Sequence, residues 1–163
     1  MAPITSTAKS IIVATGIFLI LYVSSASSAD NHMLSKMLQK IEQTHNARTY
    51  KIEAAEYKGR QVYEIETLRN GDFYESFIDP QSGQILSDEK EETMFWTPLS
   101  DDQKRAFEQT KISLWQAIEA VSEKKNSPIE EASFQIDNNN SYFEIIFEDG
   151  AKYLIDGMSG DLQ

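Results

Sequence analysis

The sequence contains no cysteine, and this absence removes three kinds of chemistry. Disulfide bonds cannot stabilise the fold, although an exported protein would permit them. A cysteine nucleophile is excluded, and so is attachment of a lipid to a cysteine at the end of an export signal. Histidine is scarce as well, because only His32 and His45 occur.

Motifs that carry catalysis are also missing. No Gly-x-Ser-x-Gly, His-Glu-x-x-His or phosphate-binding loop occurs in the chain. His32 lies near the start of the expected mature chain, and His45 lies at the end of a predicted helix, where a cationic ring suits the helix dipole. We favour capping or solvent exposure over a metal-binding or catalytic role for both. The sequence therefore predicts no enzyme and no catalytic, metal-binding or cofactor-binding residue.

Positive charge is in short supply. Lysine and arginine number 15 against 26 aspartates and glutamates, which gives a net charge of −11. Nucleic acid and anionic membrane surfaces are therefore poor partners. Residues 31–87 are nearly balanced in charge, whereas most of the acidity falls in 88–109 and 110–163. We expect a solvated acidic surface, mainly on the second half of the chain.

Long apolar runs are missing except at the start of the chain. Ile11 to Val23 is almost unbroken in apolar character but falls short of the ~20 residues that span a bilayer. Lys9 precedes the run, and Ser27 and Ala29 occupy the positions expected before a cleavage site. We expect residues 1–29 to be a signal peptide cleaved after Ala29, which predicts a periplasmic or secreted protein without membrane contact after cleavage. A retained membrane anchor is the alternative.

What the chain does contain is the same pattern twice. Each copy has an aromatic-Glu-Ile segment, a turn ending in glycine, a tyrosine and a closing Asp-to-Gly turn. These features fall at Tyr63, Gly71, Tyr74, Asp79 and Gly83 in the first copy and at Phe143, Gly150, Tyr153, Asp156 and Gly160 in the second. We interpret this as a duplicated structural unit, with a first unit at 30–87, a connector at 88–109 and a second unit at 110–163.

Each copy is predicted to be a helix followed by antiparallel strands. Apolar residues recur at helical spacing over 32–45, with Asn31 as a candidate N-cap. Alternating residues then predict strands at 50–54, 62–68 and 73–78 and a short one at 84–86, and Asn70-Gly71 favours a tight hairpin.

In the second copy, Ser113 and Gln116 form a capping box, and a helix is expected to reach Lys125 with Ile112, Trp115, Ile118 and Val121 on its apolar face. Strands are expected at 129–136, 141–148 and 151–155, followed by a short edge at the C-terminus. The fold class is therefore α+β: two repeated units, each with one helix packed on a three- to four-stranded antiparallel meander sheet.

The connector carries one non-repeated feature. Phe95 and Trp96 form an apolar island within an acidic segment, and Ser100 with Gln103 begins a short helix that reaches Gln109. Exposed aromatic side chains would lower solubility, so we favour docking of Phe95 and Trp96 between the two units. The alternative is that these two residues contact a partner.

Asp137, Asn139, Ser141 and Glu148 have the spacing of a calcium loop. Tyr142, however, occupies the position that such a loop needs for glycine, so a hairpin turn is the better interpretation.

The duplicated elements resemble the PepSY domain family. The shared features are the helix, the aromatic-x-Ile strand, the turn ending in glycine, the tyrosine-bearing strand and the Asp-x-x-Ser-Gly turn. They cover nearly the whole mature chain twice. The resemblance implies an exported bacterial protein with a non-enzymatic module that binds or restrains peptidases. For Asp79, Gly83, Asp156 and Gly160, the most recognisable positions, we favour a structural role within tight turns.

Two functions are consistent with these patterns. The first is an exported module that inhibits a peptidase or assists its folding, through a sheet edge or through Phe95 and Trp96. The second is the extracytoplasmic part of a sensor or envelope assembly, whose partner is not a peptidase. Both predict a protein partner, and both leave its identity and the oligomeric state open.

The assigned helical face can be tested with Ile118→Asp. This change places an unpaired carboxylate on the predicted core side of the second helix and should abolish cooperative unfolding. Thermal unfolding followed by circular dichroism measures the effect. A variant that melts like the wild type would show that Ile118 does not face the core.

Overall fold

The computed structural model describes residues 31–92, 98–138 and 140–163, so the expected signal peptide and the Phe95-Trp96 island lie outside the described residues. No helix in these ranges is both long and apolar enough to cross a membrane. The elements in chain order are α1 (Asn31–His45), β1 (Ala47–Tyr57), β2 (Arg60–Arg69), β3 (Asp72–Ile78), β4 (Ile85–Lys90), α2 (Asp101–Gln109), α3 (Leu114–Ser122), β5 (Ile129–Asp137), β6 (Asn140–Phe147) and β7 (Lys152–Asp156). The predicted α+β class and the order of helix before strands in both units are confirmed.

All seven described strands join one antiparallel sheet in the order β4-β3-β2-β1-β5-β6-β7. Within each unit, consecutive strands pair as a meander. The two units meet at the pairing of β1 with β5, through Lys51 with Ser133, Ile52 with Ala132 and Glu53 with Glu131. We call these three pairs the seam. The units are therefore joined edge to edge into one continuous sheet, an arrangement that the sequence patterns did not predict.

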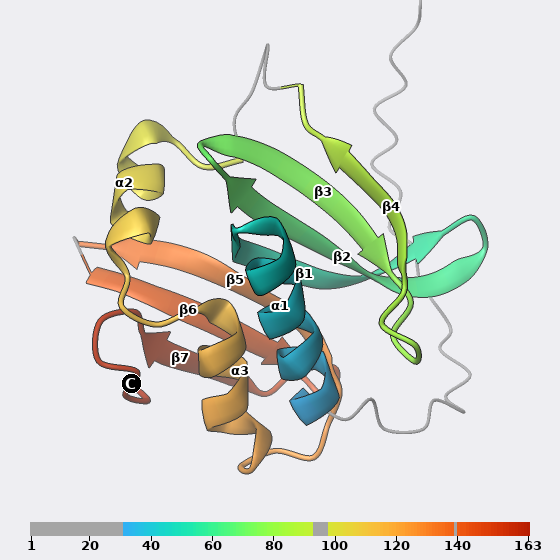
Figure 1. The fold of residues 1–163 in the computed structure, drawn as a ribbon. Coiled ribbons are helices and arrows are strands. Elements are labelled where there is room, and N and C mark those ends of the chain that lie inside the picture. The colour runs from blue at the N-terminus through green and yellow to red at the C-terminus, as the bar shows by residue number, and fades with distance from the viewer. Residues whose placement is uncertain (1–30, 93–97, 139) are drawn as a thin grey trace, which may run out of the picture.

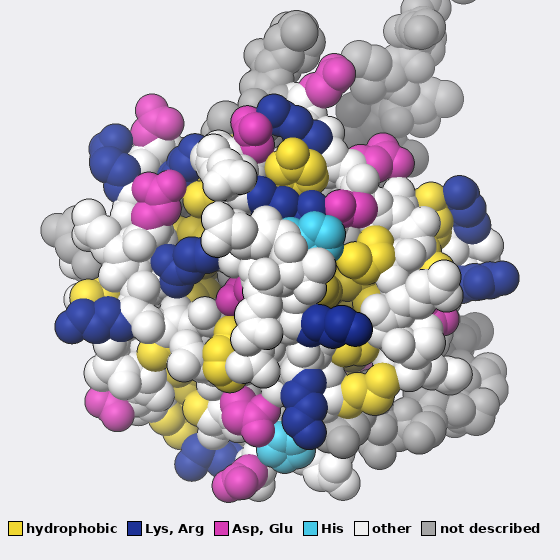
Figure 2. All heavy atoms as spheres, in the orientation of Figure 1, with side chains coloured by type: hydrophobic (Ala, Val, Ile, Leu, Met, Phe, Trp, Pro, Cys, Tyr) yellow, Lys and Arg dark blue, Asp and Glu magenta, His cyan; other side chains and the backbone are white. Residues whose placement is uncertain are grey.

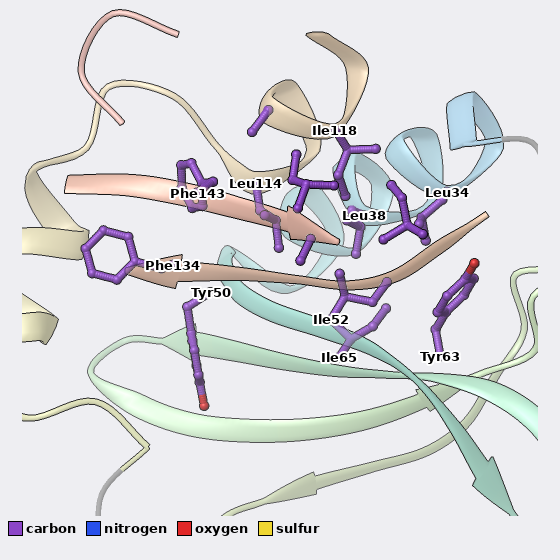
Figure 3. Packing of buried hydrophobic residues seen from close by; sticks show 14 of the residues in the cluster. Leu34, Leu38, Tyr50, Ile52, Tyr63, Ile65, Leu114, Ile118, Phe134 and Phe143 are labelled. Carbon is purple, nitrogen blue, oxygen red and sulfur yellow. The ribbon is translucent and has the colours of Figure 1, made fainter. Parts of the chain in front are cut away.

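Helices α1 and α3 pack against each other on one face of this sheet (Figure 1). Their apolar sides cover a row of residues that lie directly opposite one another on four neighbouring strands: Ile65, Ile52, Ala132 and Ile145, all with no exposed surface. Leu34 and Leu38 of α1 meet Leu114 and Ile118 of α3 above this row (Figure 3). Burial of each such leucine or isoleucine stabilises the fold by about 1.5–3 kcal/mol. Because these residues come from both units, the two units share one core.

Short-range turn signals are confirmed. Asn70 and Gly71 both have positive φ, 51° and 90°, as a two-residue hairpin turn requires. The turn at Lys58 and Gly59 has the same character, with φ of 52° and 75°.

The helix ends differ in part from the predictions. Asn31 does not act as a side-chain cap, because its Oδ1 has no hydrogen bond within the described residues and its Nδ2 donates instead to the carbonyl of Ser127. The capping box before α3 forms, since the N–H of Ser113 donates to Oε1 of Gln116 at 2.8 Å. That helix ends at Ser122 rather than Lys125.

The predicted apolar face of α3 is confirmed in part, because Ile118 and Val121 are fully buried. Its fully buried residues are Leu114, Ala117, Ile118 and Val121, whereas Trp115 and Ile112 are only partly buried. Leu114 and Ala117 complete the buried face in place of Ile112 and Trp115.

An ion pair between a buried arginine and an exposed aspartate fixes the outer strand β4. The guanidinium of Arg69, which is 7% exposed, donates to both carboxylate oxygens of Asp88, at 2.8 Å and 2.7 Å. It also contacts the hydroxyls of Thr67 and Ser76. The guanidinium lowers the pKa of the Asp88 carboxyl. These charge-assisted hydrogen bonds tie β4 to β2 across the intervening strand.

Arg48 holds α2 against the end of the sheet. Its guanidinium donates to the carbonyls of Phe107, Glu108, Thr110 and Ile112 and to the hydroxyl of Thr110. It also lies 4.8 Å from the centre of the Phe107 ring. Cations are favourable at a helix C-terminus. Phe107 is fully buried against Tyr50 of β1 and Phe134 of β5, so α2 fills the space between strands of both units.

Replacing Arg48 with alanine should destabilise the protein by about 2–4 kcal/mol, because several carbonyls of the α2–α3 connection lose their donor. Urea unfolding followed by tryptophan fluorescence measures the loss. Arg105→Ala is the matched control, since Arg105 is exposed and pairs with Asp102 on its own helix. That change should cost less than about 0.5 kcal/mol. Equal effects of the two substitutions would contradict the assigned role of Arg48.

Candidate partner-binding surfaces

The two Asp-to-Gly turns have the same hydrogen bonds. Oδ1 of Asp79 accepts from the N–H groups of Gln81 and Ser82, and the N–H of Gly83 donates to the Asp79 carbonyl. In the second unit, Oδ1 of Asp156 accepts from the N–H groups of Met158 and Ser159, and the N–H of Gly160 donates to the Asp156 carbonyl. These backbone donors lower the pKa of both carboxyls.

The closing glycines lie against the helical layer. Gly83 and Gly160 have φ of 68° and 79°, a conformation that favours glycine. A Cβ atom on Gly83 would come within 3.0 Å of the sulfur of Met37 on α1, and one on Gly160 would come within 3.6 Å of Ile112. All of these contacts are internal to the fold, and they support the structural role that we expect for the four turn residues.

Neither histidine belongs to a metal cluster, because the described residues contain no group of three or more metal-ligating side chains. Nδ1 of His32 lies 2.8 Å from Oε1 of Glu119 on α3, so this histidine contacts the other unit rather than only solvent. The hydroxyl of Ser35 donates to the other oxygen of the same carboxylate. Glu119 therefore lies between Ser35 and His32, whereas a nucleophilic serine would need the histidine in the central position.

A small hollow lies beside the C-terminal end of α1. It has a volume of about 190 Å³ and is lined by residues that include Met37, Thr44, His45 and Gly83. His45 occupies the last turn of α1, as expected. A hollow of this size is below the ~300 Å³ at which pockets for small molecules usually begin.

The two edges of the sheet differ in how they are covered. At β7, Leu162 pairs with Ile155 and the N–H of Gln163 donates to the carbonyl of Leu154, so the predicted short C-terminal edge protects this strand. At the other side of the sheet, β4 exposes the charged residues Asp88, Glu89 and Lys90. Charged side chains on an edge strand oppose unwanted pairing with other chains.

The face of the sheet opposite α1 and α3 carries most of the charge of the strands. We call it the open face, because α1 and α3 both pack on the other side (Figure 1). Two rows of directly opposed residues cross all seven strands on this face. From β4 to β7, the first row consists of Glu89, Glu75, Glu66, Lys51, Ser133, Glu144 and Leu154. The second row, in the same order, consists of Ser87, Phe77, Glu64, Glu53, Glu131, Ile146 and Lys152.

Burial and electrostatic repulsion raise the pKa of several glutamates in and beside these rows. Burial, together with the nearby carboxylates of Glu75, Glu53 and Glu66, raises the pKa of Glu64 to about 7. Burial and neighbouring carboxylates also raise the pKa of Glu75 and of Glu91. Lys51 offsets part of the repulsion, because its ammonium lies 2.9 Å from Glu53 and 3.3 Å from Glu66.

Sequence reasoning placed the acidity in the connector and the second unit, and it missed this concentration of glutamates in the first. Charge counts over 31–87 average the two faces of the sheet, although Lys51 is the one basic residue of this segment that lies in the two rows. The usable signal was the alternation in β2, where Glu64 and Glu66 alternate with Tyr63, Ile65 and Thr67. Phe95 and Trp96, the other candidate contact, lie outside the described residues.

Comparison with known families and solved structures gives one family model and one solved structure. Residues 34–89, which make up most of the first unit, match the family model described as PepSY, peptidase propeptide and YPEB domain. A crystal structure of a candidate lipoprotein from Clostridium difficile 630 is similar over 80% of this chain and 89% of that chain, with 17% sequence identity and a TM-score of 0.40. No curated protein matches the chain.

The raised pKa of Glu64 predicts how stability changes with pH. Its folded-state value of about 7 exceeds the ordinary value of 4.5, so its stabilising contribution is present in full below pH 4.5 and is lost as the pH rises through 7. Glu64→Gln should therefore stabilise the protein at pH 8 by about 1 kcal/mol, an amount reduced by solvent screening, and have little effect at pH 5.

Urea unfolding of both proteins at pH 5 and pH 8 measures this difference. Glu123→Gln, on the exposed C-terminal side of α3, is the control and should change stability equally at both pH values. A Glu64→Gln effect that does not depend on pH would show that this carboxyl is not perturbed.

Proposed function

We propose that this protein is an exported, non-enzymatic binding module that modulates a peptidase by inhibiting it or assisting its folding. The match of the first unit to a family described by peptidase propeptides carries the proposal. A propeptide acts by binding its peptidase rather than by chemistry of its own. The sequence pattern of the first 29 residues supports the exported location.

The second unit supports the proposal as a diverged copy of the first. It repeats the order of helix, three antiparallel strands, Asp-to-Gly turn and returning segment. Its turn reproduces the hydrogen bonds of the first unit at Asp156 and Gly160. We infer that the chain is a tandem PepSY protein in which both copies contribute to one continuous binding surface.

The joined sheet offers a large surface for such a partner. Seven strands spaced about 4.8 Å apart give a width of roughly 30 Å, which suits a standard protein–protein interface better than a small ligand. The charged edge at β4 is poorly suited to addition of a further strand. We therefore favour the open face over the sheet edge as the contact region.

Titration of an extract of exported proteins with the purified full-length chain tests the proposal. Peptidase activity should fall in proportion to added protein until an equivalence point, and a peptidase should co-purify with the tagged chain. The Ile118→Asp variant, added at the same concentration, should leave the activity unchanged. Capture of a non-peptidase envelope protein with unaltered activity would instead favour a sensor or assembly component.

A further inference from the structure

We propose that the open face, around Glu64, Glu66 and Glu75, binds an extended segment of a partner protein that carries lysine or arginine side chains. This inference deepens the proposed function and rests on the protein being a partner-binding module. It names the surface and the chemistry of the segment that the surface recognises.

Opposed carboxylates are the first observation. Glu66 lies directly opposite Glu75, and Glu75 lies directly opposite Glu89. Glu53 is opposite Glu64 on one side and Glu131 on the other. Like charges directly opposite each other destabilise a sheet. The isolated protein therefore holds four unfavourable pairs that a bound cation would turn into favourable contacts.

Few cations of the protein itself reach these positions. The two rows contain seven glutamates and two lysines. Lys51 pairs with Glu53 and Glu66, and Lys152 pairs with Glu144. Within the described residues, Glu64, Glu75 and Glu131 have no ion pair.

Tyr50 is the second, independent observation. It is only 3% exposed, and its hydroxyl has no hydrogen bond of ordinary geometry within the described part of the chain. Burial raises the pKa of this hydroxyl, and so do the nearby carboxylates of Glu66, Glu91 and Glu75 and a weak contact of the hydroxyl with the Glu66 carboxylate. Figure 3 shows the ring directed away from α1 and α3, with the oxygen at its far end.

Among the described residues, Glu91, beside the same glutamates, also has a buried unpaired atom. Oε2 of Glu91 also has no hydrogen-bond partner among the described residues. Buried polar atoms are almost always paired, so two unpaired ones beside the same carboxylates indicate a missing donor. A guanidinium or ammonium group supplies several donors and can serve a tyrosine oxygen and carboxylates together.

The layout of the carboxylates favours a basic peptide segment over a single metal ion. The described residues contain no cluster of metal-ligating side chains, because the glutamates are spread along rows rather than gathered around a point. Glu66 and Glu89 are two inter-strand spacings apart, or about 10 Å. An extended chain covers about 10 Å in three residues, so cations at every third position match the row.

The other side of the molecule does not offer the same attraction. On the helix side, lysine and arginine side chains lie among acidic ones (Figure 2), and Lys36 and Lys40 of α1 are exposed there. This asymmetry would direct a basic segment toward the open face and speed its association.

Fluorescence anisotropy with a labelled peptide tests the surface directly. The probe is a peptide of about a dozen residues with arginine at every third position and glycine or serine between, and a peptide with glutamine in place of arginine is its control. The full-length protein should bind the arginine peptide, with affinity that falls as salt is added, and should not bind the glutamine peptide.

Three substitutions locate the site. At pH 8, Glu64→Gln, Glu66→Gln and Glu75→Gln combined remove three charges with little change of shape and should weaken binding by about tenfold or more. Glu56→Gln, Glu123→Gln and Glu148→Gln combined remove three exposed charges elsewhere and should change the affinity less than about twofold. Equal losses in the two triple variants, or no binding of the arginine peptide by the wild type, would overturn the proposal.

Tyr50→Phe provides a test without a change of charge. The variant lacks only the hydroxyl and should fold normally, because that hydroxyl makes no ordinary hydrogen bond within the described residues. It should bind the arginine peptide measurably more weakly than the wild type. Unchanged affinity would remove the hydroxyl from the site and contradict the proposed contact.

The peptidase titration separates this inference from the proposed function. If the Glu64, Glu66 and Glu75 triple variant inhibits peptidase activity as well as the wild type, the proposed function holds and the assigned surface is wrong. If the peptide binds at the open face but no peptidase is inhibited, the surface holds and the peptidase partner is wrong.

Discussion

The three residue pairs of the seam between β1 and β5 determine how the rest of the molecule is arranged. They place Ile52 directly opposite Ala132, and this pair joins the inner apolar rows of the two units into one. The same pairing brings α1 beside α3, so that one shared core replaces two that would each be marginal at this size. On the other side of the sheet, the seam aligns the glutamates of both units into continuous rows.

The two faces of the sheet differ in how their charged groups are paired. On the inner side, Arg69 pairs with Asp88, although the buried Oγ1 of Thr49 has no hydrogen-bond partner among the described residues. On the open face, carboxylates face one another and the hydroxyl of Tyr50 lacks a partner of ordinary geometry among the described residues. Natural proteins tend to leave charges and polar groups unpaired at functional sites more often than elsewhere.

Local signals in the sequence predicted local structure well. The Asn70-Gly71 hairpin, the Ser113 capping box and the repeated helix-then-strand order each depend on neighbours within a few residues, and all are present. The seam could not be predicted in this way, because it pairs residues about eighty positions apart that carry no distinctive motif. The open face was missed for a related reason, since its rows appear only once strand register assigns each glutamate to a side.

The brevity of the seam has a consequence for how the chain assembles. Each unit, taken alone, presents β1 or β5 as an edge strand with unsatisfied backbone groups. The same three pairs can form between units of two different chains, which is the geometry of domain exchange. What favours closure within one chain is the covalent link between β4 and α3, which holds the second unit near the first at an effective concentration in the millimolar range. The connector thus acts as a covalent tether that favours pairing of β1 with β5 within one chain over pairing between two chains.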